Sequence, residues 1–288
     1  MHISVLQEPI LELFSQVKLK LFIDATLGAA GHSLAILQHH PELTSVIGFD
    51  RDPSALAIAK SLLPDTSIFI YSNYRYMKER LLEHNITQVD GILFDIGVSS
   101  MQLDQKERGF SFQQDGPLDM RMDSTQTLTA EDVVSSYPEE KLANIIYNYG
   151  EEHASRRIAK AIVQARRKDR IDTTKKLVDV IETVLPRRGK IAPATKTFQA
   201  LRIEVNSELE SLETALKSAL ELLAPGGILA VISFHSLEDR IVKNFFKEQD
   251  KEIFSVLTKK PLVASPEECR QNPRSRSAKL RAIKRVSC

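Results

Sequence analysis

The chain has 288 residues, of which 42% are hydrophobic and 27% are charged. This length allows about two domains, or one domain with an insertion, and the composition excludes a largely disordered or fibrous protein. The longest uncharged stretch, residues 222–237, contains Pro-Gly-Gly and a histidine, so it predicts no membrane span. We expect no signal peptide, and the two cysteines predict no disulfide framework and indicate a reducing cytoplasm.

Charge is distributed unevenly along the chain, although the net charge is only +1. Residues 151–190 contain twelve Lys and Arg residues against six Asp and Glu residues. Residues 270–288 contain seven basic residues and no acidic one. This segregation indicates either a surface that faces a polyanion or a solvated helix face followed by a basic tail, and charge alone does not decide between them.

The first hundred residues alternate apolar runs with helical segments. The runs at 21–23, 46–49, 68–70 and 89–94 predict strands, and the segments between them predict helices, one of which has Pro53 in its first turn. Apolar runs separated by helices are typical of βαβ units with a buried parallel sheet.

The pattern changes after residue 102. Residues 103–190 contain few strand-like runs and many helix formers. Beyond them we predict a helix over 198–223 with one apolar stripe, a turn over 224–227, a strand over 228–232, a helix over 237–247, and strands at 253–257 and 279–286. We therefore predict a doubly wound, Rossmann-like α/β domain formed by residues 1–102 and 195–288, with residues 103–194 as a helical insertion that recognises the substrate.

A small-residue loop, Gly28-Ala-Ala-Gly31, follows the first strand. In doubly wound sheets, ligands bind at the carboxyl ends of the strands, and glycines allow the backbone to approach them closely. Asp50 ends the second strand, twenty-two residues after Gly28. A carboxylate at that place can accept hydrogen bonds from a ribose diol.

NAD and S-adenosylmethionine both contain such a ribose. A dinucleotide site uses G-x-G-x-x-G, which this loop lacks, and Asp24 before the loop would repel a pyrophosphate. S-adenosylmethionine has no phosphate and carries an ammonium and a sulfonium group. The order D-x-x-x-G-x-x-G over residues 24–31 therefore favours a methyltransferase over a dehydrogenase.

The fourth strand ends at Asp95, which is followed by a flexible loop. Methyl transfer to an exocyclic amine is an in-line displacement that depends mainly on alignment. The Asp95 carboxylate could accept an N–H of such an amine and help to localise its lone pair. The alternative interpretation is that Asp95 is a cap or turn residue.

Longer motifs then identify a resemblance that spans nearly the whole chain. They lie at residues 24–33, 95–104, 108–112, 115–123, 197–202, 205–210, 233–240 and 272–276. Together they resemble the RsmH (MraW) family of bacterial small-subunit rRNA (cytosine-N4)-methyltransferases. The resemblance implies a cytoplasmic enzyme that transfers a methyl group from S-adenosyl-L-methionine to N4 of a cytosine in the decoding region of 16S rRNA.

The resemblance also implies which residues contact the methyl donor. They are Ala30, Gly31, His32, Asp50, Tyr74, Asp95 and Gln102. This sequence departs from the family at two of these places, because Ala29-Ala30 stands where Arg-Gly is usual and Tyr74 replaces a more usual Phe. The family lacks the Pro-Pro-aromatic sequence of other amino-methyltransferases, so the group that holds the target base stays open.

Further candidates are expected around the substrate. We predict Asp95 and His235 as catalytic residues and place Ser236 in the substrate pocket. The alternative for residues 234–236 is a helix start capped by Ser236. The basic insertion predicts a phosphate-binding platform that includes Arg156, Arg157, Lys160, Arg166, Arg167 and Lys168. Arg274, Arg276, Lys279 and Arg281 either add to this platform or belong to the last strand.

Other site classes have less support. The seven histidines show no metal-ligand motif, so we predict no metal. A hydrolase triad of Ser99 or Ser100 with His235 and Asp95 lacks the G-x-S-x-G elbow. The remaining alternatives are a methyltransferase that modifies an amine in DNA or protein, and an RNA-binding assembly factor that retains a donor pocket.

We expect small-subunit rRNA or the assembled small ribosomal subunit as the partner, and no membrane. The sequence leaves the oligomeric state open, with a homodimer as one alternative.

Overall fold

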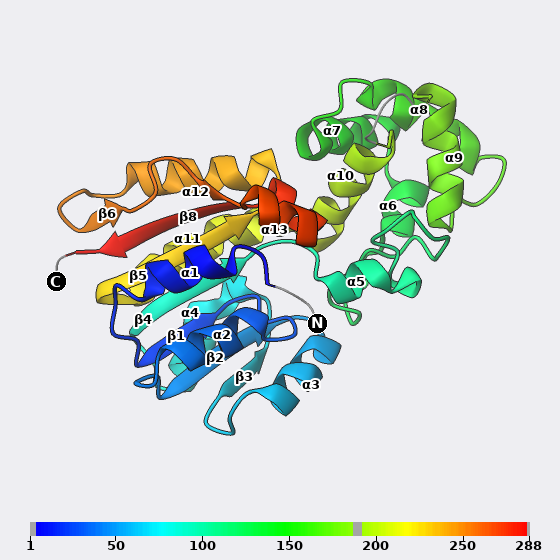
Figure 1. Cartoon of the computed structure of the whole chain (residues 1–288). Coiled ribbons are helices and arrows are strands. Elements are labelled where there is room, and N and C mark those ends of the chain that lie inside the picture. The colour runs from blue at the N-terminus through cyan, green and yellow to red at the C-terminus, as the bar shows by residue number, and fades with distance from the viewer. Residues whose placement is uncertain (1–3, 187–191, 287–288) are drawn as a thin grey trace. The chain divides into compact units, whose positions relative to one another are not determined.

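The computed structural model describes residues 4–186 and 192–286, and the chain folds into two compact units (Figure 1). Unit 1 comprises the chain up to Gly97 and from Leu209 onward, and unit 2 comprises Val98–Glu208. The boundaries expected from the sequence, 102 and 194, assign residues 195–208 to the sheet domain instead. The difference arises because α10 (Thr195–Asn206) packs on α7 (Glu139–Gly150) of unit 2.

Unit 1 is built on a sheet with the strand order β3-β2-β1-β4-β5-β8-β6, with β7 paired to β8. Strands β1 to β5 pair with one another in parallel. β8 runs antiparallel to β5, β6 and β7. The bounds are β1 Leu21–Asp24, β2 Ser45–Asp50, β3 Ile68–Tyr71, β4 Val89–Asp95, β5 Leu223–Ser233, β6 Phe254–Val256, β7 Leu262–Val263 and β8 Lys279–Arg285. This arrangement confirms the predicted doubly wound sheet.

Helices cover both faces of this sheet (Figure 1). On one face lie α1 (Gln7–Phe14), α2 (Gly31–His39) and α3 (Pro53–Leu62), and on the other lie α4 (Met77–Glu83), α11 (Glu208–Leu222) and α12 (Ser236–Glu248). Neighbouring strand residues therefore enter different cores: Leu93 packs beneath α1 to α3, and Phe94 packs beneath α4, α11 and α12. Burial on both faces explains why these strands are continuous apolar runs rather than alternating ones.

Shorter elements complete unit 1. They are η1 (Tyr74–Tyr76), α13 (Pro266–Gln271) and η3 (Pro273–Ser277). The turn expected at residues 224–227 lies inside β5, where pairing with β4 passes from Leu223 directly to Ile228. These four residues form an irregularity in the strand, and Gly226 supplies the left-handed backbone there, with φ +85°.

The single helix predicted over 198–223 is wrong. The chain forms two helices, α10 and α11, because Ser207 adopts a left-handed conformation with φ +48°. The apolar stripe is consequently divided between two cores. Leu201 and Val205 belong to the core of unit 2, whereas Leu212 belongs to that of unit 1.

Unit 2 is mainly helical. Besides α7 and α10 it contains α5 (Ser100–Asp104), η2 (Lys106–Arg108), α6 (Ala130–Ser136), α8 (Ser155–Arg166) and α9 (Thr174–Val184). Its core is formed by apolar faces of these helices, including Ile146 of α7, Ile162 of α8 and Leu177 of α9. The buried Asn206 amide holds the loop before α6, since its oxygen accepts the Met122 N–H and its nitrogen donates to Met120 O, both at 2.8 Å.

Candidate active site

Three carboxylates lie at the carboxyl ends of neighbouring parallel strands of unit 1. In the register, Asp24 of β1 pairs with Gly48 of β2 and with Leu93 of β4. Asp50 and Asp95 therefore each extend two residues beyond these partners, at the same edge of the sheet. The topological switch lies between β1 and β4, because β2 and β3 follow on one side and β5 on the other. This is the place where doubly wound sheets bind ligands.

Asp24 is the most deeply buried of the three, with 2% of its surface exposed. Its Oδ2 accepts a 2.7 Å hydrogen bond from the Ser33 hydroxyl, and its Oδ1 accepts the Thr26 N–H at 3.3 Å. Burial raises the pKa of Asp24 to about 6, although Ser33, the His32 ring and Thr26 favour the ionised form. The β1 end thus carries a carboxylate that would be stabilised by a nearby cation.

Asp50 fixes the loop after β1 to the end of β2. Its Oδ2 accepts the Gly28 N–H at 2.9 Å, and its Oδ1 accepts the Asp52 N–H at 2.8 Å. Burial raises the pKa of Asp50 above its usual range, against these two hydrogen bonds. Each carboxylate oxygen has a second lone pair, so Asp50 can still accept from a ligand diol.

Asp95 and His32 face each other across this edge. His32 Nε2 lies 3.5 Å from Asp95 Oδ2, and the Asp95 backbone N–H donates to the Thr26 hydroxyl at 2.7 Å. Burial alone would lower the pKa of His32, but the carboxylates of Asp95, Asp24 and Glu268 raise it above its usual value. Both ring nitrogens of His32 and Oδ1 of Asp95 are buried without a hydrogen-bond partner in the described part of the chain. Buried polar atoms of this kind indicate a site that a polar ligand completes.

The loop that carries His32 is tightly held. Ala30 precedes α2 in the left-handed region, with φ +62°, and is fully buried. A Cβ atom on Gly31 would lie 2.3 Å from the Ser4 Oγ, so a larger residue here would have to displace the Ser4 hydroxyl. Tyr74 follows β3 by three residues, and its 7% exposed ring meets that of Phe94 edge-on at 5.4 Å within the core of unit 1.

The end of β5 supplies the other predicted catalytic residue. β5 pairs with β4 so that Ile232 lies opposite Asp95, and His235 follows three residues later at the same edge. His235 is the N-cap of α12, and its Nε2 lies 3.0 Å from Oε1 of the buried Glu238. Ser236 is the exposed first residue of α12. A helix does start here, but its cap is His235 and not the expected Ser236. The place of residues 234–236 in the substrate pocket stays a prediction.

Gln102 belongs to unit 2 and lies in α5. Its side-chain oxygen accepts the Ser99 backbone N–H at 3.2 Å, and its backbone N–H donates to the Ser99 hydroxyl at 3.2 Å. These two bonds form a capping box at the start of α5. Gln102 is 5% exposed. The structure thus gives this residue a local structural contact.

The basic residues of α8 fall into two groups. Arg157 donates to Val184 O at 3.1 Å and Arg166 donates to Val134 O at 2.7 Å, so both brace unit 2. Arg156 is exposed on α8, and Arg167 is exposed directly after it. Arg157 is exposed as well, but its guanidinium is held by Val184 O, so Arg156 and Arg167 are better placed for a polyanion.

The basic tail is partly structural. Lys279 and Arg281 lie in β8 and both bind Asp239 of α12, at 3.2 and 2.7 Å. Arg281 is 7% exposed. These two residues therefore belong to the last strand, which was the second alternative for the tail, whereas Arg276 is exposed in η3.

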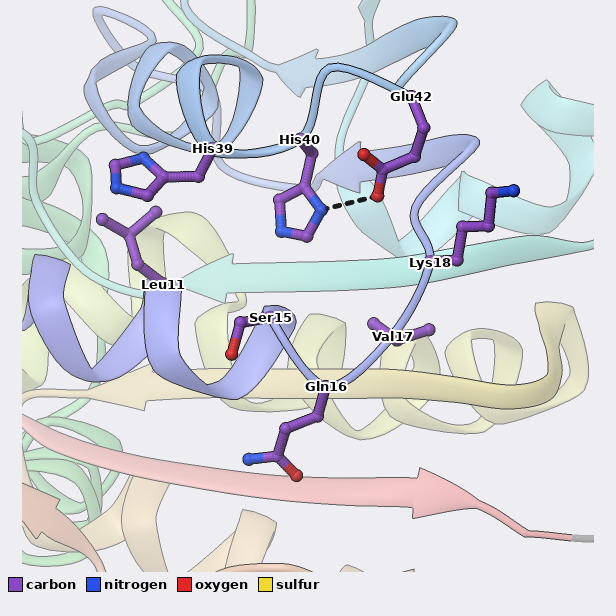
Figure 2. Close-up of a pocket in the computed structure, with 8 residues that line it drawn as sticks. All are labelled: Leu11, Ser15, Gln16, Val17, Lys18, His39, His40 and Glu42. Atoms are coloured by element: carbon purple, nitrogen blue, oxygen red, sulfur yellow. Dashed lines mark hydrogen bonds and ion pairs between the residues drawn. The ribbon is translucent and has the colours of Figure 1, made fainter.

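A pocket of about 450 Å³ opens at the opposite edge of the sheet (Figure 2). Its lining includes Lys18, which precedes β1, and His40 and Glu42, which precede β2. The Nδ1 of His40 lies 2.9 Å from Glu42 Oε1. This pocket is at the amino ends of the strands, so it is separate from the carboxylate edge.

Several residues that support the site were not predicted as site residues. Thr26 and Ser33 lie within the motif at residues 24–33, and their hydroxyl groups bind Asp95 and Asp24. Glu238 lies within the motif at residues 233–240, and its Oε2 accepts the backbone N–H groups of Phe234 and His235. In the sequence, the only indication of the roles of Thr26 and Ser33 is that short hydroxyl side chains occur in the same motif as Asp24.

Comparison with known proteins gives full-length matches. The model of the MraW methylase family matches residues 1–286. Two relatives are named ribosomal RNA small subunit methyltransferase H. The protein from Persephonella marina is 50% identical over 292 residues, which cover 99% of both chains. The protein from Deinococcus deserti is 52% identical over 287 residues, which cover 99% of this chain and 93% of the relative. A crystal structure of a Clostridium thermocellum rRNA-methylase candidate aligns with TM-score 0.51 and 15% identity, covering 99% of this chain and all of that one, and supports the fold.

Proposed function

Since the chain belongs to the MraW methylase family, we infer that it is a methyltransferase that modifies the RNA of the small ribosomal subunit. Its substrate is a cytosine in the decoding region of 16S rRNA, and the methyl group goes from S-adenosyl-L-methionine to N4 of that base. The observation that carries this proposal is a sequence identity of about 50% over nearly the full length of relatives named ribosomal RNA small subunit methyltransferase H.

The carboxylate edge of unit 1 is suited to this donor. Asp24 and Asp95 offer negative charge near an ammonium and a sulfonium group, and Asp50 offers lone pairs to a ribose diol. A pyrophosphate would instead face these carboxylates. The buried atoms of His32 and Asp95 that lack partners among the described residues fit a polar ligand at this edge.

We assign the donor contacts accordingly. Ala30, Gly31 and His32 form the loop beneath the donor, and Tyr74 provides an aromatic surface for the adenine. The donor contact of Gln102 stays a prediction from the family resemblance. When bound, S-adenosylmethionine supplies a methyl group on a positively charged sulfur, which is a good electrophile.

The chain's own residues then have to orient the amine and receive its proton. Oδ1 of Asp95 is free to accept an N–H of the cytosine amine, which localises the nitrogen lone pair toward the donor. His235, at the end of the neighbouring strand, is proposed to help hold the base, together with Ser236. Most of the acceleration comes from alignment, which can supply about 7–11 kcal/mol.

Unit 2 is proposed as the substrate-recognition part of the chain. Arg156 and Arg167 would contact RNA phosphates directly, and Arg157 and Arg166 would support that surface through their backbone hydrogen bonds. Reaction on a base requires it to leave the stack, which is easier for a single-stranded or bulged nucleotide.

A cytoplasmic location follows from the proposed rRNA substrate. Among the described helices, none combines the length and the hydropathy that a membrane span needs. A homodimer remains an alternative to a monomer, and the molar mass by light scattering distinguishes them.

The decisive experiment incubates the chain with tritiated S-adenosylmethionine and three acceptors: small subunits lacking the modification, free 16S rRNA, and DNA. We expect label in the subunit or its RNA, mapped to N4 of one decoding-region cytosine. Label in DNA or protein would indicate another amine as substrate. Label in none of them, together with tight RNA binding, would identify an assembly factor instead.

A further inference from the structure

The helix α13, near the end of the sequence, contacts the N-terminal segment of the chain. Glu268, in α13, accepts the backbone N–H of Leu6 through its Oε1 at 2.7 Å, across 262 residues. Leu6 is the N-cap of α1, is fully buried, and has a left-handed conformation with φ +54°. A bulky residue in that region is unusual and needs its surroundings to hold it there.

The N-terminal segment held in this way lies directly on the donor loop. Ser4, two residues before Leu6, is 7% exposed, and its hydroxyl occupies the space that a Cβ atom on Gly31 would need. The contact of Glu268 with Leu6 therefore fixes the segment that closes over Gly31. The next residue of that loop is His32.

Glu268 also acts on His32 by its charge. Three carboxylates favour the protonated ring, in decreasing order Asp95 of β4, Asp24 of β1 and Glu268 of α13. Each acts against the effect of burial. A protonated His32 in turn favours the ionised form of Asp24.

Hydrogen bonds at both ends of α13 hold the backbone of Glu268 in place. The Ser265 hydroxyl caps α13 by accepting the Glu268 N–H at 3.1 Å, and the Asn272 N–H donates to Glu268 O at 2.7 Å. Asn272 then starts η3, where its side chain accepts the Arg274 N–H. The motif at residues 272–276 thus anchors the end of α13.

We propose that Glu268 is a positioning residue of the donor site, which fastens the segment Ser4–Leu6 onto Gly31. The inference rests on the proposed function, because it assigns the loop to donor binding. Glu268 touches neither reactant, so its effect passes through the loop.

The test compares Glu268→Gln, which keeps a hydrogen-bond acceptor but removes the charge, with Glu268→Ala, which removes both. Glu267→Gln is the matched control, since Glu267 is exposed on the same helix and binds Arg270 and Gln271. All three are made in the full chain. Measurements are the Kd for S-adenosylmethionine by calorimetry, KM and kcat of methyl transfer, and the NMR titration of His32, assigned with His32→Gln.

We expect the donor Kd and KM to rise about tenfold in Glu268→Ala and about threefold in Glu268→Gln, with kcat within about twofold of the original. The His32 titration midpoint should fall in both variants and stay unchanged in Glu267→Gln. If both Glu268 variants match the control in donor Kd and in His32 titration, the proposal is overturned. If Glu268→Ala fails to fold, Glu268→Gln alone decides by the same two readouts.

Failure of the proposed function gives a different result. An original chain that binds S-adenosylmethionine but labels no RNA would contradict the function, while a shifted His32 titration and donor Kd would still support the role of Glu268.

Discussion

The hydroxyl of Ser33 donates a 2.7 Å hydrogen bond to the buried carboxylate of Asp24. This contact joins the last residue of β1 to the first turn of α2, on either side of the donor loop. Burial raises the pKa of this carboxyl to about 6, although the hydrogen bond from Ser33 favours its ionised form. The negative charge of Asp24 is therefore poorly stabilised by the chain alone. A cationic ligand at this edge of the sheet would stabilise it.

Asp24→Asn should change how stability depends on pH. The pKa of Asp24 is about 6 in the folded chain against an ordinary 3.8, so its favourable contribution is complete below about pH 4 and is lost as pH rises through about 6. Relative to the variant, the original chain should lose about 3 kcal/mol of unfolding free energy between about pH 4 and 7. Chemical denaturation at several pH values measures this. Exposed Asp65→Asn is the control, and parallel pH curves for Asp24→Asn and the original would contradict the prediction.

Donor affinity should follow the same ionisation. A cationic donor favours ionised Asp24, so its Kd should rise by up to about tenfold per pH unit below pH 6, where Asp24 is protonated. Calorimetry with S-adenosylmethionine between about pH 5 and 8 tests this, and a flat profile in the original chain would remove Asp24 from the donor site.

Asp50→Ala should weaken donor binding by about 1.5–3 kcal/mol, or about ten- to a hundredfold in Kd, because a diol loses a charged acceptor. Asp50→Asn should fall between, since its amide oxygen still accepts one of the N–H groups of Gly28 and Asp52. An unchanged Kd in both variants would place the ribose elsewhere.

The sequence predicted the carboxylate edge because strand ends can be read from apolar runs, and Asp24, Asp50 and Asp95 each follow one. It failed at Ser207, where the backbone turns left-handed and divides an apolar stripe that continues in the sequence. The contact between Glu268 and Leu6 could not be predicted, since no periodicity links residues 262 positions apart. Burial of Arg281 was likewise hidden, because a basic tail has the same composition whether it is solvated or paired.

Charge reversal at Arg156 and Arg167 should weaken RNA binding and flatten its salt dependence. For a single strand, the slope of log K against log salt should become shallower by about 0.7 for every phosphate that the variant no longer neutralises. Arg157→Gln and Arg166→Gln should instead lower Tm, because their guanidinium groups hold Val184 O and Val134 O. Filter binding at several salt concentrations separates the pairs. An unchanged slope after reversal of Arg156 and Arg167 would move the phosphate surface elsewhere.

Asp239→Asn should destabilise the chain without affecting phosphate contacts. Asp239 binds both Lys279 and Arg281, and although burial opposes its ionisation, these two cations hold the pKa of its carboxyl below the usual range. Removing its charge leaves the guanidinium of Arg281 buried without compensation, which costs about 3–5 kcal/mol. Arg276→Gln, at an exposed position of η3, should leave the unfolding free energy unchanged. Equal stability of the two variants in denaturant would show that the paired charges of β8 contribute nothing to the fold.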